Sequence, residues 1–121
     1  MKIRIKGNSV RFRLTQSEVK KLSTEGIVVE TTAFESANFT YQVKQYAGIT
    51  ALQANFENNC ISMLVPEPEA KEWYANNLVG HDNTMLLQSG EKLYLLLEKD
   101  FTCMDNTIED QSDNYPNPKL Q

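Results

Sequence analysis

Four cations near the start of the chain are the residues best suited to bind an anion. The segment KIRIKGNSVRFRL places them on either side of Gly7-Asn8, which fits a two-residue hairpin loop. Side chains alternate between the faces of a strand, so this register puts Lys2, Arg4, Arg11 and Arg13 on one face, with Arg4 opposite Arg11. Guanidinium groups offer two parallel donors to a phosphate or carboxylate. We therefore predict an anion-binding or arm-docking face at these four residues.

Like charges directly opposite one another on a sheet destabilise the pair by roughly 0.2–1 kcal/mol. Three arrangements would relieve this repulsion in the hairpin. The long side chains could extend into water, an acidic segment of the same chain could lie over them, or an external anion could bind between them. The sequence pattern does not choose among the three.

An acidic segment near the other end of the chain is the natural partner within the molecule. Residues 1–21 hold seven bases and one acid, whereas residues 98–113 hold six acids and one base, in a chain of net charge −4. We expect residues 104–121 to form an acidic arm that either packs on the domain or is disordered. In the packed form, Asp110 and Asp113 would meet Arg11 and Arg13. The arm residues expected to take part are Asp105, Glu109, Asp110, Asp113 and Tyr115.

Other chemistry has weaker support in the sequence. The acidic segment has no glycine, which an EF-hand loop requires, and the single histidine disfavours a zinc site. Cys103 and His81 are the residue types of a nucleophilic pair, but the acids near Cys103 would raise its thiol pKa. No phosphate-binding or dinucleotide-binding glycine motif is present. The sequence predicts no cofactor and identifies no catalytic residue or metal ligand.

The elements that position these residues follow from periodicity and turn residues. Thr15-Gln16-Ser17-Glu18 is a capping box, which predicts a helix from Gln16 to Glu25 that ends at Gly26. Pro66 and Pro68 predict the start of a second helix, which would run to Leu78. The hydrophobic pattern predicts strands at 27–34, 38–46, 48–56, 59–65, 84–88 and 92–99.

These elements predict an α+β fold with an N-terminal β-hairpin, two short helices and a mostly antiparallel sheet that is either open or curled like a barrel. Short connections between the four middle strands favour antiparallel pairing. The run Leu93–Leu97 is apolar at every position, so this last strand should be central and covered on both faces. The sequence shows no internal repeat. We expect one domain, residues 1–103, followed by the arm.

Composition narrows the cellular setting. The longest apolar run is far shorter than the roughly 20 residues of a membrane helix, and charges alternate through the first six residues. Two cysteines suit free thiols in a reducing compartment. The pI of about 5.0 disfavours a nucleic-acid partner. We expect a cytoplasmic protein with neither membrane nor nucleic acid as a partner.

Both ends of the chain carry family-specific motifs. The opening KIRIKGNSVRFRLTQSEV, the segment EKDF-x-C and the closing ED-x-x-D-x-YPNP resemble an uncharacterised family of small bacterial proteins. The resemblance implies a bacterial, intracellular, single-domain protein in which the acidic arm belongs to the folded unit. It implies no catalytic residue.

Three functions fit these observations. The favoured one is a non-enzymatic binding or interaction module whose basic sheet face is covered by its acidic arm, with a small anionic ligand or a protein as partner. A second is a small metal-dependent hydrolase of a phosphorylated substrate, with Glu98, Asp100 or Asp105 holding the metal. A third is a structural subunit that forms homo-oligomers through the edge strand 48–56.

Overall fold

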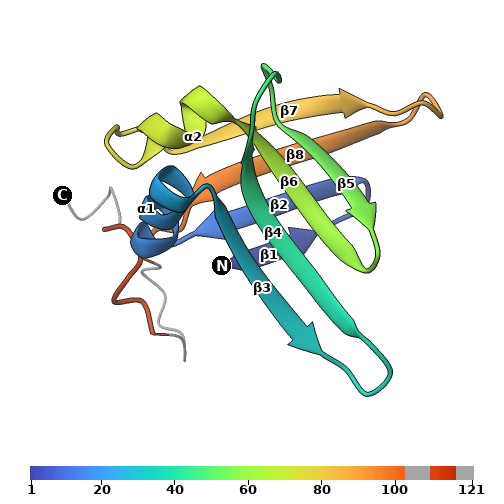
Figure 1. Ribbon diagram of the computed structural model, residues 1–121, viewed down its shortest axis with the longest axis horizontal. Helices are drawn as coiled ribbons and strands as arrows, with labels where there is room; N and C mark the ends of the chain where they lie inside the picture. Colours follow the sequence, from blue (N-terminus) through green and yellow to red (C-terminus); the bar gives the residue numbers. More distant parts are fainter. Residues whose placement is uncertain (103–109, 117–121) are drawn as a thin grey trace.

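The chain folds into two four-stranded sheets joined by two helices, as the computed structural model of residues 1–102 and 110–116 shows (Figure 1). The strands are β1 (Lys2–Ile5), β2 (Ser9–Leu14), β3 (Ile27–Ala33), β4 (Asn38–Tyr46), β5 (Gln53–Glu57), β6 (Cys60–Pro66), β7 (Gly80–Leu86) and β8 (Lys92–Lys99). The helices are α1 (Gln16–Glu25) and α2 (Glu67–Trp73). The α+β prediction is confirmed, but the two sheets stay open and form no barrel.

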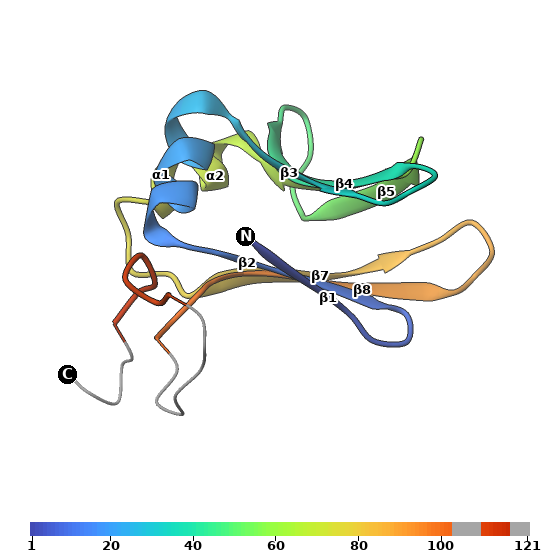
Figure 2. The ribbon, with the colours of Figure 1, turned by 90° about the horizontal axis from the view of Figure 1, so that it is seen from below.

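The two sheets lie as separate layers with both helices at one end (Figure 2). Sheet A has the strand order β1-β2-β8-β7 and sheet B has the order β3-β4-β6-β5. Helix α1 leads from β2 in sheet A to β3 in sheet B, and α2 leads back from β6 to β7. The hairpin loops gather at the end opposite the helices.

The core fills the space between the layers and beneath the helices. Strand alternation turns one face of each sheet inward, and α1 and α2 close the helical end. Neither helix in the described part of the chain is long and apolar enough to cross a membrane. The largest fully buried side chains are Trp73, Phe12, Leu14, Leu22, Leu52, Met63, Leu95, Leu97, Val19, Val43 and Val65.

The first hairpin and helix form as their local sequence predicts. Ile5 pairs with Val10 and Arg4 with Arg11, so the predicted register is confirmed. Helix α1 spans Gln16–Glu25 with the complete capping box, and Gly26 ends it at φ 86°, a left-handed conformation that favours glycine. Ile5 lies on the edge strand β1 and is 56% exposed, although its partner Val10 is buried.

Two predictions about the sheets are wrong, one about the pairing of the middle strands and one about the burial of β8. Strands β4 and β6 pair in parallel, with β5 displaced to the edge, so the four middle strands are not a simple antiparallel meander. Strand β8 is central, as predicted, and lies parallel to β2. The prediction that both of its faces are covered is wrong, because only one face is fully buried. Its outer face carries Tyr94 and Leu96 beside the arginines of β2.

Three element boundaries also differ by several residues from the predicted ones. Helix α2 ends at Trp73, where the indole Nε1 donates a 2.7 Å hydrogen bond to the Leu78 main-chain oxygen and fixes the turn that follows. Strand β5 begins at Gln53, after a loop in which Leu52 is buried. The seventh strand begins at Gly80, four residues before its predicted start.

The order of elements repeats even though the sequence does not. The first half of the chain runs β1-β2-α1-β3-β4 and the second runs β5-β6-α2-β7-β8. Each half contributes one hairpin to each sheet, and the halves meet in the parallel pairs β2/β8 and β4/β6. The helices α1 and α2 pack against each other. The two sheets are therefore built by the same rule from interleaved halves.

Candidate anion-binding face

The outer face of sheet A gathers the predicted basic residues. Lys2, Arg4 and Lys6 come from β1 and its turn, and Arg11 and Arg13 come from β2; we call these five residues the basic face. The inner side chains of the same strands, Phe12 and Leu14 among them, are buried in the core. Core packing therefore fixes which way the cations point, because strand alternation leaves them only the outer side.

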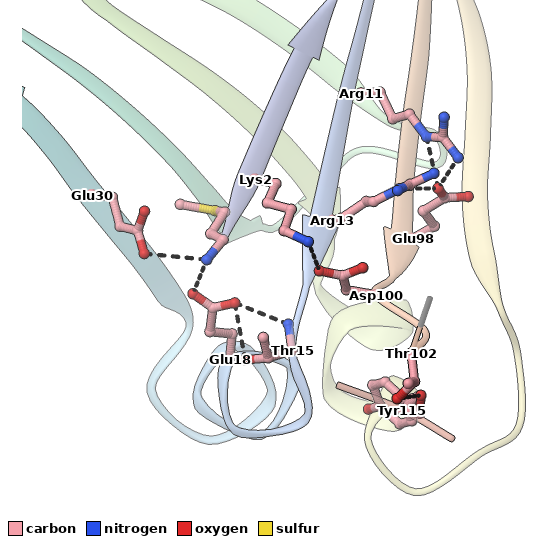
Figure 3. Close-up of polar contacts among 11 residues, drawn as sticks. Lys2, Arg11, Arg13, Thr15, Glu18, Glu30, Glu98, Asp100, Thr102 and Tyr115 are labelled. Carbon is pink, nitrogen blue, oxygen red and sulfur yellow. Dashed lines mark hydrogen bonds and ion pairs between the residues drawn. The ribbon is translucent and has the colours of Figure 1, made fainter. Parts of the chain in front are cut away.

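Glu98 neutralises part of the basic face. Its Oε1 accepts hydrogen bonds from Nε of Arg11 at 2.7 Å and from Nε of Arg13 at 2.8 Å, and Arg11 adds a contact through its terminal nitrogen (Figure 3). Glu98 stands beside Arg13 in the register of β2 and β8. Glu98 is therefore an acidic partner of these two arginines from the same chain, but it belongs to the central strand β8 and not to the predicted arm.

Lys2 is also held by an acid. Its Nζ lies 3.0 Å from Oδ2 of Asp100, which is buried just after β8 (Figure 3). The Asp100 backbone is fixed on both sides, since its amide donates to Leu14 and its carbonyl accepts from Tyr115. Lys2 therefore helps to link the first hairpin to the C-terminal segment through Asp100.

Arg4 is different from the other arginines. It lies directly opposite Arg11 and is exposed, and no carboxylate within residues 1–102 and 110–116 forms an ion pair with it. Two shallow hollows, of about 180 and 310 Å³, meet at Arg4 and Arg11. Arg4 can therefore offer its guanidinium group to an external acceptor.

Apolar side chains lie next to these cations. The smaller hollow is lined by Tyr94 and Leu96 of β8 as well as by Arg4, Lys6 and Arg11. Tyr94 is 40% exposed. A ligand here would meet cationic groups on one side and an apolar surface on the other, which suits an anion with an apolar part.

The described part of the predicted arm is attached to a different place from the one expected. Asp113 accepts hydrogen bonds from the Ser17 hydroxyl and, at 3.2 Å, from the Ser17 amide at the start of α1. These contacts and those of Thr15 lower the pKa of Asp113. Asp110 accepts from the Ser112 amide, which lowers its pKa too. Neither acid reaches Arg11 or Arg13.

Tyr115 anchors the same segment. It pairs with Phe101 through a parallel bridge and a ring contact of 5.7 Å, and its carbonyl accepts from the Thr102 amide and hydroxyl (Figure 3). Burial raises the pKa of Tyr115 to about 12. The predicted partners Asp105 and Glu109 lie outside the described residues.

Of the alternative reactive pair, the structure describes only His81. His81 packs edge-on against Trp73 at 5.0 Å and lies 3.6 Å from Glu69, while Cys103 is outside the described residues. Burial lowers the pKa of His81 despite Glu69, which acts in the opposite direction. Within residues 1–102 and 110–116, no three metal-ligating side chains cluster.

Two buried cations were not predicted from the sequence. Lys99 is 5% exposed, donates to the Asn76 carbonyl at 2.8 Å and lies over the rings of Trp73 and Tyr115. Burial lowers its pKa. The Met1 amino group forms the second, pairing with Glu18 at 2.6 Å and Glu30 at 3.2 Å (Figure 3). Local periodicity carries no signal for either arrangement.

A model of a family of unknown function (DUF7009) matches residues 1–119, so the chain belongs to this family. The predicted membership of an uncharacterised family is confirmed. No curated protein and no solved structure matches the chain significantly. The function must therefore be argued from the geometry of the chain itself.

Proposed function

We propose that this member of the family is a non-enzymatic binding module that recognises an anionic group on the outer face of sheet A. The juxtaposition of Arg4 and Arg11 carries the proposal. Arg4 and Arg11 are paired directly across β1 and β2, and Glu98 binds Arg11, whereas no carboxylate of the described residues forms an ion pair with Arg4. An anion between them would replace a repulsion with two charge-assisted hydrogen bonds.

The neighbouring groups support binding more than catalysis. The hollows at Arg4 are lined by cations, by Ser9 and by the apolar or aromatic residues Ile3, Val10, Tyr94 and Leu96. None of these side chains is poised as a general base or a nucleophile. Phosphate and carboxylate are the two acceptor groups that fit a guanidinium fork.

We further propose that the acidic arm competes with the ligand. Two of its acids, Asp105 and Glu109, follow closely after Asp100, which holds Lys2. We also propose a bacterial, cytoplasmic setting for this module, and the free thiol of Cys60 supports a reducing compartment. Neutralising the two acids together should raise the affinity of the basic face for anions.

Titration calorimetry with inorganic phosphate and pyrophosphate tests the proposal. We expect Arg4→Gln to weaken binding by about tenfold or more, because a hydrogen bond between charged groups is worth roughly 1.5–3 kcal/mol. Binding should also weaken as salt is added. Arg4 is exposed at the sheet edge, so the variant should retain the wild-type unfolding temperature.

Lys21→Gln is the matched control, since it removes the same charge from the exposed side of α1. It should leave phosphate and pyrophosphate affinity nearly unchanged. Equal affinities for the wild type and the Arg4 variant, or equal losses in both variants, would contradict the proposal.

A further inference from the structure

Strand β1 presents an open hydrogen-bonding edge. It is the outermost strand of sheet A and pairs only with β2 within the described residues. The Lys6 amide donates to Ser9, while the Asn8 and Leu14 carbonyls accept from β8 and the residue after it. Because bonded and non-bonded pairs alternate in an antiparallel ladder, Arg4 bonds to β2, and the amides of Ile3 and Ile5 point outward.

The inner side of this edge is also incomplete. Ile5 belongs to the face that packs against sheet B, yet it is 56% exposed, while its partner Val10 is buried. Ile3 is only partly buried against the core. One more strand beside β1 would cover both isoleucines if it carried apolar residues on that side.

The outer side of the edge selects the charge of such a strand. Arg4 and Lys6 point to the outer face, and within the described residues no carboxylate pairs with Arg4. A strand placed next to β1 would have its outward side chains beside these cations, where cross-strand pairs of opposite charge are favourable. Acidic residues at alternate positions meet this requirement.

We propose that β1 binds an extended protein segment in which acidic residues alternate with apolar ones, so that the segment becomes a fifth strand of sheet A. The acids lie beside Arg4 and Lys6, and the apolar residues cover Ile3 and Ile5. The inference rests on the proposed function, because Arg4 supplies the charge in both. The inference adds hydrogen bonds from the main chain of Ile3 and Ile5 to the charge of Arg4, and it therefore identifies the partner as an extended protein segment.

A second copy of this chain does not fit the same edge. Two β1 strands side by side would bring Lys2, Arg4 and Lys6 of one copy next to those of the other, and cations at an edge are a known protection against self-pairing. The edge therefore repels its own copies and accepts an acidic strand. The positive charge of β1 therefore makes binding selective for acidic segments.

Binding of two short peptides to the full chain tests the inference. One alternates Glu and Val, and the other has the same composition arranged in blocks. We expect the alternating peptide to bind at least tenfold more tightly. The Ile3 and Ile5 amides should exchange with solvent more slowly in its presence, while the inward-pointing Arg4 amide, already bonded to β2, should change little.

N-methylated peptides separate strand pairing from charge. Alternate amides of a strand point to opposite edges, so methylating one alternate set removes the bonds to β1 and methylating the other leaves them intact. Methylation of the amides that face β1 should abolish binding, and methylation of the other alternate set should leave binding unchanged. Arg4→Glu should also abolish binding of the Glu peptide and create binding of a Lys-Val peptide, while Lys21→Glu should do neither.

The results distinguish this inference from the proposed function. Phosphate binding that depends on Arg4, together with equal affinities for the alternating and block peptides, would overturn the inference alone. Protection of Ile3 and Ile5 by the alternating peptide without any phosphate binding would overturn phosphate as the ligand of the proposed function and leave the inference standing. Absence of binding by every probe would overturn both.

Discussion

Glu98 on β8 accepts a hydrogen bond from Nε of Arg11 on β2 at 2.7 Å, which joins the first hairpin to the last strand by charge. The same oxygen accepts from Arg13. We expect Glu98→Gln to lower the free energy of unfolding by roughly 1–2 kcal/mol, because two arginines lose their shared counter-ion. Phosphate should bind this variant several-fold more tightly. Urea unfolding and calorimetry check both effects, and Glu57→Gln, at an exposed position, should change neither.

Gly80 has no room for a side chain. A Cβ atom there would lie 2.7 Å from the Leu97 carbonyl oxygen and 2.9 Å from the Glu98 Cβ. We expect Gly80→Ala to force β7 away from β8 and to lower the free energy of unfolding by roughly 1–3 kcal/mol. Asp82→Asn is the control, because Asp82 lies on the same strand and is exposed. Equal stabilities of the Gly80 variant and the wild type would refute the prediction.

The Met1 amino group should make stability fall at alkaline pH. Burial disfavours its charged form, but Glu18 and Glu30 outweigh burial and hold its pKa above the ordinary 8.0. Its contribution is therefore complete below pH 8.0 and is lost as pH rises through the folded-state pKa. Urea midpoints measured between about pH 7.5 and 9.5 should decline. In Glu30→Gln the decline should be shallower, and identical slopes would contradict this origin.

His81 should act in the opposite direction at mildly acidic pH. Burial, together with Lys99, lowers its pKa below the ordinary 6.5, against the effect of Glu69. The unfolded chain therefore binds more protons here, and stability should rise with pH until about 6.5. His81→Gln should remove this slope while leaving the alkaline decline in place. A ring titration by NMR with a midpoint at or above 6.5 would exclude the mechanism.

Asp113 should hold the C-terminal segment against α1. Its carboxylate accepts from Ser17, and its carbonyl accepts from the Gln16 amide at 2.9 Å. In Asp113→Asn the loss of the charged acceptor should speed hydrogen exchange at Ser17 and at Tyr115, whose amide is bonded to Asp100. Asp110→Asn, which affects only the Ser112 turn, should leave both amides protected. Unchanged exchange in both variants would show that the contact is dispensable.

The locally determined part of the fold could be predicted from the sequence. Gly7-Asn8 and the flanking alternation fix the register from Ile5–Val10 to Lys2–Arg13, because a two-residue loop leaves one pairing that buries Phe12. The capping box and Gly26 fix α1 in the same way. These signals act over a few residues and need no knowledge of the rest of the chain.

The neighbours of each hairpin could not be predicted in this way. Periodicity shows that β8 is apolar but not that it lies parallel to β2, so the contact of Glu98 with Arg11 had no sequence signal. Because the sequence does not show the neighbours of β8, it predicts that both faces of this strand are covered. Leu96 is as apolar as a core residue, but it faces outward beside Arg11. Which strands meet is decided by packing across the whole domain.

The interleaving of the two halves also sets the order in which the protein can form as it is made. Strand β2 lies next to β8, the last of the described strands along the chain, so the first hairpin gains this neighbour only after every other described strand has been made. Sheet B can assemble earlier, since β3 to β6 follow one another in the chain. Until β8 emerges, Phe12 and Leu14 are open to contact with other molecules, and the neighbouring cations Arg11 and Arg13 disfavour association with like chains.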